Sequence, residues 1–212
     1  MFKLFSIVEE KESPINGKIQ IVRDLQGARI IVGGVSQSGW LVKSIWNKAL
    51  KKVTSNKKQV TRVLILGLGG GSAAELVQKY WPGTKITGVD IDPLMVEMGK
   101  KHLQLASIEN IEVVIGDAWE YVETVEGKGI KYDLVLVDLF NGSKIPEKFY
   151  REKFIRSIQK ILAPGGVAAF NHLYSFIEKE TAHKLQKKLR NIFITVSTVL
   201  PEANIIFLCF NK

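Results

Sequence analysis

Glycine and aspartate residues follow four apolar runs of the chain, and these residue types can bind a ligand or move a proton. The first run, residues 63–66, leads into Gly67, Gly69 and Gly71 and then into helix-forming residues. Glycine lets the backbone turn sharply and approach a ligand with no side chain between them. The N-terminus of the following helix offers free N–H groups. The turn therefore predicts a ligand site, with these three glycines as its first candidate residues.

The residues beside the turn bear on which ligand it holds. Nucleotides, dinucleotides and S-adenosylmethionine can all bind such a turn. The dinucleotide fingerprint G-x-G-x-x-G/A requires Gly or Ala at position 72, but the sequence has Ser72 followed by Ala73. A nicotinamide cofactor is therefore disfavoured, although the turn alone does not exclude it.

Two further runs end in residues that suit the two parts of an adenosine group. Asp90 follows the turn by roughly twenty residues, where a carboxylate can accept hydrogen bonds from both ribose hydroxyls. We assign Asp90 and the adjacent Ile91 to the cofactor. Asp117 can accept a hydrogen bond from the exocyclic amine of adenine, with the N–H of Ala118 directed at the ring. A helix N-cap is a second role that Asp117 can combine with the first.

The fourth run ends at Asp138, the candidate for chemistry. In a doubly wound sheet its side chain would project into the cleft where a transferred group lies. A carboxylate in that place can orient or deprotonate an amine, so we predict Asp138 to be catalytic. We expect no metal site, because His102, His172 and His183 lie on scattered elements without ligand spacing.

Alternating strands and helices are needed to bring these residues together. The hydrophobic pattern predicts strands over 62–68, 85–91, 111–117, 132–140 and 166–173, and helices over 72–81, 93–104, 118–125, 147–162 and 176–192. This order predicts an α/β fold with a Rossmann-like, doubly wound and mostly parallel sheet. A C-terminal hairpin over 194–211 adds an antiparallel strand.

A smaller N-terminal part precedes the alternating region. Residues 15–34 predict a small β-hairpin, and residues 40–53 predict a helix with one apolar face. Residues 54–59, TSNKKQ, form a polar connector. We therefore divide the chain into residues 1–53, the hairpin plus helix, and residues 61–212, a Rossmann-like domain. The glycine turn with Asp90 and Asp117 predicts that this domain binds S-adenosylmethionine.

Composition and charge predict a cytoplasmic protein. No apolar run approaches the roughly 18 residues of a membrane span, so we expect no membrane association. The N-terminus shows no signal-peptide pattern, and the single cysteine, Cys209, fits a reducing compartment. The net charge of +9 comes from scattered lysines and arginines, two groups of which lie opposite apolar helix stripes, so it is weak support for a nucleic-acid partner. A homodimer is left open.

The motifs together resemble the spermidine-synthase superfamily, from about Ile15 to the C-terminus. The shared features are the N-terminal hairpin and the motifs GGVSQS, VLILGLGGGS, VDIDP, IGDAWEYV, YDLVLVDLF and LAPGGV. The resemblance implies that Gln37 contacts the methionine-like end of the cofactor. It also implies that Asp138 occupies the position of the family's catalytic aspartate.

The sequence departs from the polyamine aminopropyltransferases of that superfamily at acidic positions. By resemblance, the aspartate of their G-G-G-D-G-G turn, which holds the aminopropyl donor, is replaced by Gly70. Their Tyr-His/Gln-Glu element falls on Trp46, Asn47 and Lys48, and their second active-site aspartate falls on Asn141. Without these carboxylates the site lacks the negative charge that would bind a polycation such as putrescine. The pattern is more similar to the spermidine-synthase-like domains of some protein methyltransferases.

We therefore expect an S-adenosylmethionine-dependent methyltransferase whose acceptor is a small molecule or a protein, with an amine as the acceptor group that suits Asp138. The first alternative is a polyamine aminopropyltransferase that uses decarboxylated S-adenosylmethionine. The second is a cofactor-binding module without catalysis. Nucleic acid is not expected as the acceptor, because DLFN stands where amino-directed nucleic-acid methyltransferases carry an Asn-Pro-Pro-Tyr loop.

Overall fold

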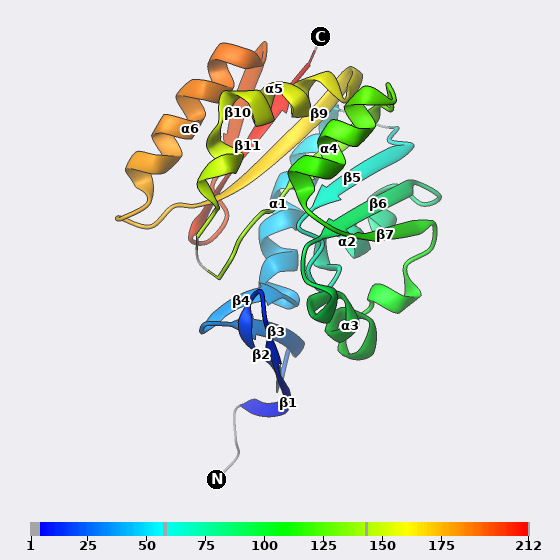
Figure 1. Cartoon of the computed structure of the whole chain (residues 1–212), viewed down its shortest axis with the longest axis vertical. Helices are drawn as coiled ribbons and strands as arrows, with labels where there is room; N and C mark the ends of the chain where they lie inside the picture. Colours follow the sequence, from blue (N-terminus) through cyan, green and yellow to red (C-terminus); the bar gives the residue numbers. More distant parts are fainter. Residues whose placement is uncertain (1–4, 57–58, 143, 212) are drawn as a thin grey trace.

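A seven-stranded sheet forms the centre of the structure. The computed structural model describes residues 5–56, 59–142 and 144–211 (Figure 1). The strand order in the sheet is β10-β11-β9-β8-β5-β6-β7. The strands are β5 (Arg62–Leu66), β6 (Lys85–Asp90), β7 (Ile111–Ile115), β8 (Tyr132–Val137), β9 (Leu162–Leu173), β10 (Thr195–Val199) and β11 (Asn204–Phe210).

The strand directions confirm the predicted fold class. Strands β7, β6, β5, β8 and β9 run parallel to one another. Strand β11 runs antiparallel to both β9 and β10. Chain order reverses between β5 and β8, which makes this pair the switch point of the doubly wound sheet. Residues Val63–Leu66 of β5 and Leu134–Val137 of β8 are continuously apolar and buried, as expected for strands with helices on both faces.

Helices cover both faces of the sheet, and their apolar sides bury two separate cores. One core contains α4 (Ala118–Gly127), α5 (Glu152–Lys160) and α6 (Lys179–Ile192), which lie on the same side of the sheet in Figure 1. The other core contains α1 (Trp40–Asn56) and α2 (Ser72–Tyr80), with Val96 added from α3 (Pro93–His102). No helix within the described ranges is long and apolar enough to cross a membrane.

The N-terminal region is a four-stranded antiparallel sheet, so the predicted hairpin is only its central part. Its strands lie in the order β1 (Phe5–Ser13), β2 (Gly17–Asp24), β3 (Gly27–Val32) and β4 (Val35–Ser38). The sequence did not reveal β1 because most of its residues are exposed, so it lacks the alternation that marks a half-buried strand. Buried isoleucines of β2 and β3 pack against Met95 and Met98 of α3.

Helix α1 joins the two sheets and packs on the large one. Trp46, Leu50 and Val53 are fully buried in the core that also contains β5 and β8 residues. The predicted helix over 40–53 is therefore confirmed, with three further residues at its end. The division of the chain into residues 1–53 and 61–212 stays a prediction.

Two predicted boundaries after the fourth strand are wrong. The helix predicted over 147–162 is a 3-10 turn, η2 (Glu147–Tyr150), followed by α5, because Arg151 between them has an extended conformation. Strand β9 begins at Leu162 and continues through Pro164 and two glycines, with a register shift against β8. The separate η2 turn carries Lys148, whose importance for the site is described below.

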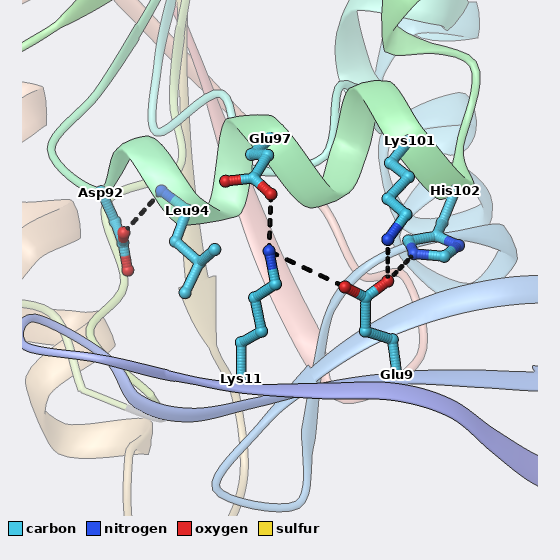
Figure 2. A network of polar contacts seen from close by, with 7 residues as sticks. All are labelled: Glu9, Lys11, Asp92, Leu94, Glu97, Lys101 and His102. Carbon is cyan, nitrogen blue, oxygen red and sulfur yellow. Dashed lines mark hydrogen bonds and ion pairs between the residues drawn. The ribbon is translucent and has the colours of Figure 1, made fainter.

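A cluster of charged side chains fixes β1 to helix α3 (Figure 2). Glu9 of β1 accepts a hydrogen bond from Lys101 at 2.7 Å and lies 2.5 Å from Nε2 of His102, at the C-terminal end of the helix. Lys11, on the same strand, pairs with Glu97 at 2.6 Å. These contacts attach the exposed edge strand to the body of the protein.

The same region is fixed a second time at the N-terminus of α3. Asp92 caps the helix by accepting the N–H of Leu94 at 2.9 Å. Its other oxygen accepts hydrogen bonds from the Ser13 hydroxyl at 2.5 Å and from the Asn16 amide at 2.7 Å. The turn between β1 and β2 is therefore attached directly to the loop that follows β6.

The Glu9 contacts make the stability of the protein depend on pH in acid. Hydrogen bonds from Lys101 and then from His102 lower the pKa of Glu9 from 4.5 to about 2. A carboxylate whose pKa is lower in the folded state stabilises that state above its unfolded pKa, and the contribution is lost as pH falls from 4.5 to about 2. We expect Glu9→Gln to lower the melting temperature at neutral pH. We also expect the melting temperature of this variant to fall less steeply than that of the wild type as the pH is lowered from 4.5 to about 2.

Thermal unfolding measured as a function of pH checks this expectation. Glu12→Gln is the matched control, because Glu12 lies on the same strand but outside the cluster of Figure 2. A Glu9→Gln curve that parallels the wild-type curve from neutral pH down to pH 2 would contradict a role of Glu9 in attaching β1.

Candidate functional site

A cavity of about 500 Å³ opens where the carboxyl ends of β5, β6, β7 and β8 meet. Most of the residues predicted for the site line this cavity: Gln37, Gly67, Gly69, Asp90, Ile91, Asp117, Ala118 and Asp138. Gly71 is not among the lining residues. It precedes α2 with φ of 90°, and a Cβ atom there would lie 2.9 Å from Leu105, so it shapes the turn from behind the cavity.

The glycine turn has a conformation that other residues rarely adopt. Gly67 and Gly69 have φ values of +86° and +53°. A Cβ atom on Gly67 would lie 2.1 Å from the backbone oxygen of Asp138, so this glycine lets β5 and β8 approach closely at the switch point. The cavity therefore has bare backbone on one side and the Asp138 carboxyl group nearby.

Asp90 holds the turn from the end of β6. One carboxyl oxygen accepts the N–H of Gly69 at 2.6 Å, and the other accepts the N–H of Asp92 at 2.9 Å. Burial raises the pKa of Asp90, and the two backbone hydrogen bonds oppose that rise. Each carboxylate oxygen can accept a further hydrogen bond. Asp90 therefore keeps acceptor capacity for two further hydrogen bonds, beside the half-exposed apolar side chain of Ile91.

Asp117 caps helix α4 and also faces the cavity. Its Oδ1 accepts the backbone N–H groups of Trp119 at 2.9 Å and Glu120 at 3.3 Å. Its Oδ2 pairs with the ammonium group of Lys148 from η2. Burial alone would raise the pKa of Asp117, but the Lys148 contact and the backbone donors outweigh it, so the pKa is lowered. The carboxylate stays ionised and can accept a hydrogen bond from an adenine amine.

The segment after β8 forms the outer wall of the cavity. Gln37 of β4 donates from Nε2 to the backbone oxygen of Gly142 at 2.9 Å. The lining residues of this wall are Leu139, Phe140, Asn141, Gly142, Pro146, Lys148 and Phe149. Gln37 and Asp117, both predicted to bind the cofactor, therefore each contact this wall.

Asp138 lies at the end of β8 and is bound through both of its carboxyl oxygens. Oδ2 accepts the indole N–H of Trp46 at 2.7 Å, and Oδ1 accepts the amide of Asn171 at 2.8 Å. Asn171 in turn accepts a hydrogen bond from the amide of Asn204 at 2.9 Å. Burial raises the pKa of Asp138, while the Trp46 and Asn171 hydrogen bonds oppose the rise. A carboxyl group with a raised pKa and a place in the cavity wall can take up a proton.

The part of the cavity around Asp138, which we call the Asp138 side, is otherwise apolar or amide-lined. Its lining residues are Leu41, Val42, Ile45, Asp138, Asn171, Leu173, Ala203 and Asn204. In this part of the described chain, Asp138 is the single carboxyl group. The other two lining carboxylates, Asp90 and Asp117, belong to the opposite, glycine-turn side.

At the positions where the sequence lacks the acidic residues of the aminopropyltransferases, the described cavity wall has no other carboxyl group in their place. Lys48 pairs with Glu202 at 2.8 Å, and Asn47 accepts the Tyr80 hydroxyl hydrogen bond at 2.5 Å. Asn141 does line the cavity. At Gly70 a Cβ atom would lie 2.5 Å from Leu103, so an aspartate does not fit there unless neighbouring side chains move.

Several lining residues were not predicted from the sequence. Asn171 follows the same rule as Asp90, since it lies near the carboxyl end of β9, which is parallel to β8. The adjacent His172 is buried, with its Nε2 2.9 Å from the Tyr150 hydroxyl. The lining residues Ile15 and Asn16 come from the β1–β2 turn, which no local pattern connects to the site.

Comparison with known proteins is consistent with this architecture. Fold and cavity together define a Rossmann-like α/β protein with an N-terminal antiparallel sheet and a ligand site at the switch point. Residues 45–207 match the family model described as "Spermine/spermidine synthase domain". The chain belongs to this family.

Named relatives in the family carry out two different transfers. A polyamine aminopropyltransferase of Vibrio vulnificus is 34% identical over 110 residues, 52% of this chain and 37% of that protein. The eEF1A lysine and N-terminal methyltransferase homolog of Drosophila melanogaster is 28% identical over 150 residues, 61% of this chain and 22% of that protein. The matched region thus spans between 22% and 37% of the length of these relatives.

The solved structures support the fold. A spermidine synthase in complex with the transition-state analogue AdoDATO superposes with a TM-score of 0.81 at 16% identity. The superposition covers 97% of this chain and 74% of the synthase chain. It therefore includes the N-terminal sheet as well as the Rossmann-like region.

Proposed function

We propose that the protein is an S-adenosylmethionine-dependent methyltransferase of the spermidine-synthase-like type, acting on a single amino group. The observation that carries the proposal is the Asp138 side of the cavity, where the described lining residues include one carboxyl group and two amides. A diamine carries two positive charges, and one carboxylate leaves the second charge without a partner. A single amine needs only one carboxylate.

The glycine-turn side fits the cofactor. Asp90 would accept hydrogen bonds from the ribose, Ile91 and Ala118 would pack on the adenine, and Asp117 would accept from its exocyclic amine. Gly67 and Gly69 would let the methionine part pass close to the backbone, with Gln37 at its far end. Decarboxylated S-adenosylmethionine shares the adenosine part, so these residues alone do not separate the two cofactors.

Methyl transfer requires little from the protein beyond alignment of the two reactants and a proton acceptor. When bound, S-adenosylmethionine supplies an electrophilic methyl group for an attacking nitrogen. Asp138 would hold the amine in the cavity and take one of its protons, which leaves the nitrogen lone pair free to react. The raised pKa of Asp138 brings its proton affinity closer to that of an amine than an ordinary aspartate's would be.

The names of the relatives and the single carboxyl group on the Asp138 side support a proposal for the acceptor class. One relative is named for methylation of lysine and the N-terminus of eEF1A, and such groups are single amines on a polypeptide. We therefore propose a protein amino group or a small monoamine as the acceptor. A cytoplasmic location, the absence of a nucleic-acid acceptor and a homodimer remain predictions.

Calorimetric binding of S-adenosylmethionine and of its decarboxylated form tests the proposal. We expect preference for the carboxylated cofactor, methyl transfer to members of a panel of monoamines and basic proteins, and negligible spermidine formation from putrescine. The reverse preference with robust spermidine formation would establish the aminopropyltransferase alternative. Tight binding of either cofactor without transfer to any acceptor in the panel would favour a non-catalytic module.

A further inference from the structure

Asp138 accepts hydrogen bonds from two separate elements, and a third element holds one of these two donors. Trp46 of α1 donates to Oδ2 at 2.7 Å, and Asn171 of β9 donates to Oδ1 at 2.8 Å. Asn204, at the start of β11, donates to the Asn171 side-chain oxygen at 2.9 Å. We propose that Trp46 and the Asn204–Asn171 pair are positioning residues that fix the Asp138 carboxyl group for proton transfer. The inference rests on the proposed function, in which Asp138 receives a proton from the acceptor.

The Asn204–Asn171 pair determines which way an amide faces Asp138. A side-chain amide can present either its oxygen or its NH2 group to a neighbour. Because Asn204 donates to the oxygen of Asn171, the NH2 group of Asn171 is left to face the carboxylate. Both asparagines are 6% exposed, so neither readily exchanges its partner for water. Asn204 therefore acts on Asp138 through Asn171.

Trp46 holds the other carboxyl oxygen of Asp138, the one that Asn171 does not contact. Its side chain is fully buried, so an indole N–H without a partner would be costly there. Donors on both oxygens fix the plane of the carboxyl group, which a donor on one oxygen would leave free to rotate. The remaining acceptor capacity of the two oxygens is then available to the cavity that Asp138 lines.

The donors around Asp138 are neutral, and that matters for its proton affinity. Burial raises the pKa of Asp138, and among the described residues the opposing influences are the hydrogen bonds from Trp46 and Asn171, with no ionised side chain taking part. A lysine or arginine in their place would hold the carboxylate ionised and unable to accept a proton near neutral pH. Neutral donors orient the group and still allow it to be protonated.

Direct titration of the Asp138 carboxyl group tests the proposal. Protein labelled with ¹³C at the aspartate carboxyl carbons is titrated by NMR, and the Asp138 resonance is identified by its loss in Asp138→Asn. Trp46→Phe removes one donor, and Asn204→Leu releases the Asn171 amide. We expect the pKa of Asp138 to rise in both variants. Tyr80→Phe, which removes a hydroxyl bonded to the neighbouring Asn47, is the matched control and should leave it unchanged.

Kinetics add a readout that a merely structural role would not change. Once an acceptor is found, the acidic limb of the pH–kcat profile should move to higher pH in Trp46→Phe and Asn204→Leu, with KM for the cofactor unaltered. Wild-type titration of Asp138 in both folded variants would overturn the proposal. If Trp46→Phe does not fold, Asn204→Leu decides, because it leaves the α1 core intact. The titration needs neither cofactor nor acceptor, so absence of methyl transfer would refute the proposed function without affecting this test.

Discussion

Asp138→Asn is expected to lower turnover on the order of 10²-fold or more while cofactor affinity changes by less than about threefold. The substitution keeps the shape of the side chain and removes its capacity to take a proton. The neighbouring amides can adapt if Asn171 and Asn204 both flip, because Asn171 would then offer its oxygen to the new NH2 group and donate its own NH2 group to the Asn204 oxygen. The loss should therefore lie in the chemical step.

Stability distinguishes this role from a structural one. A carboxyl group whose pKa is raised by folding stabilises the folded state below its unfolded pKa, and this contribution is lost as pH rises through the folded pKa. Removing the charge in Asp138→Asn should therefore not lower the melting temperature at neutral pH. Full turnover in the variant would remove Asp138 from the mechanism, and a large fall in stability with normal turnover per folded molecule would make it a structural residue. A screen of monoamines and basic proteins for acceptors must precede the measurement.

Asp90→Ala is expected to weaken S-adenosylhomocysteine binding at least tenfold. The variant would lose the two ribose hydrogen bonds proposed for Asp90, each worth about 1.5–3 kcal/mol because the acceptor is charged. It also releases the N–H groups of Gly69 and Asp92, which Asp90 holds in the folded chain. Calorimetric titration measures the affinity, and circular dichroism with thermal unfolding shows whether the fold persists.

Asp90→Asn separates the two contributions in that result. It keeps an oxygen that can accept the Gly69 N–H but removes the charge, so we expect a loss of affinity between wild type and Asp90→Ala. Unchanged affinity in both variants, provided they are folded, would mean that Asp90 serves the glycine turn alone and that the ribose is bound elsewhere.

The sequence was sufficient for the large sheet, and the site residues selected from it line the cavity, with the exception of Gly71. Asp90, Asp117 and Asp138 could be selected because each follows an apolar strand, and parallel strands bring their carboxyl ends to one edge. Gly67 was recognisable by the turn it makes between β5 and α2. These predictions depend on local patterns and on one general rule of sheet topology.

Residues that reach the site from distant parts of the chain could not be predicted in this way. Trp46 lay on the apolar face of a predicted helix and at a position where the resemblance expects tyrosine, and neither pattern indicated a contact with Asp138. Its indole N–H reaches Asp138 because α1 packs on the large sheet. Lys148 was hidden in a helix predicted over 147–162, which the structure divides into two elements. The position of Asn204 depends on the pairing of β11 with β9, and the local sequence does not show which strands pair.

The position of β11 has a consequence for biosynthesis and for engineering. This strand is the last one in the described chain, yet it lies inside the sheet, between β9 and β10. It also supplies Asn204 to the cavity wall. A nascent chain must therefore leave a gap in its sheet until residues 204–210 have emerged from the ribosome, and the Asn171 side chain lacks its Asn204 partner before that moment. Shortening the chain within β11 would open the sheet in its interior, whereas shortening β1 would remove only an edge.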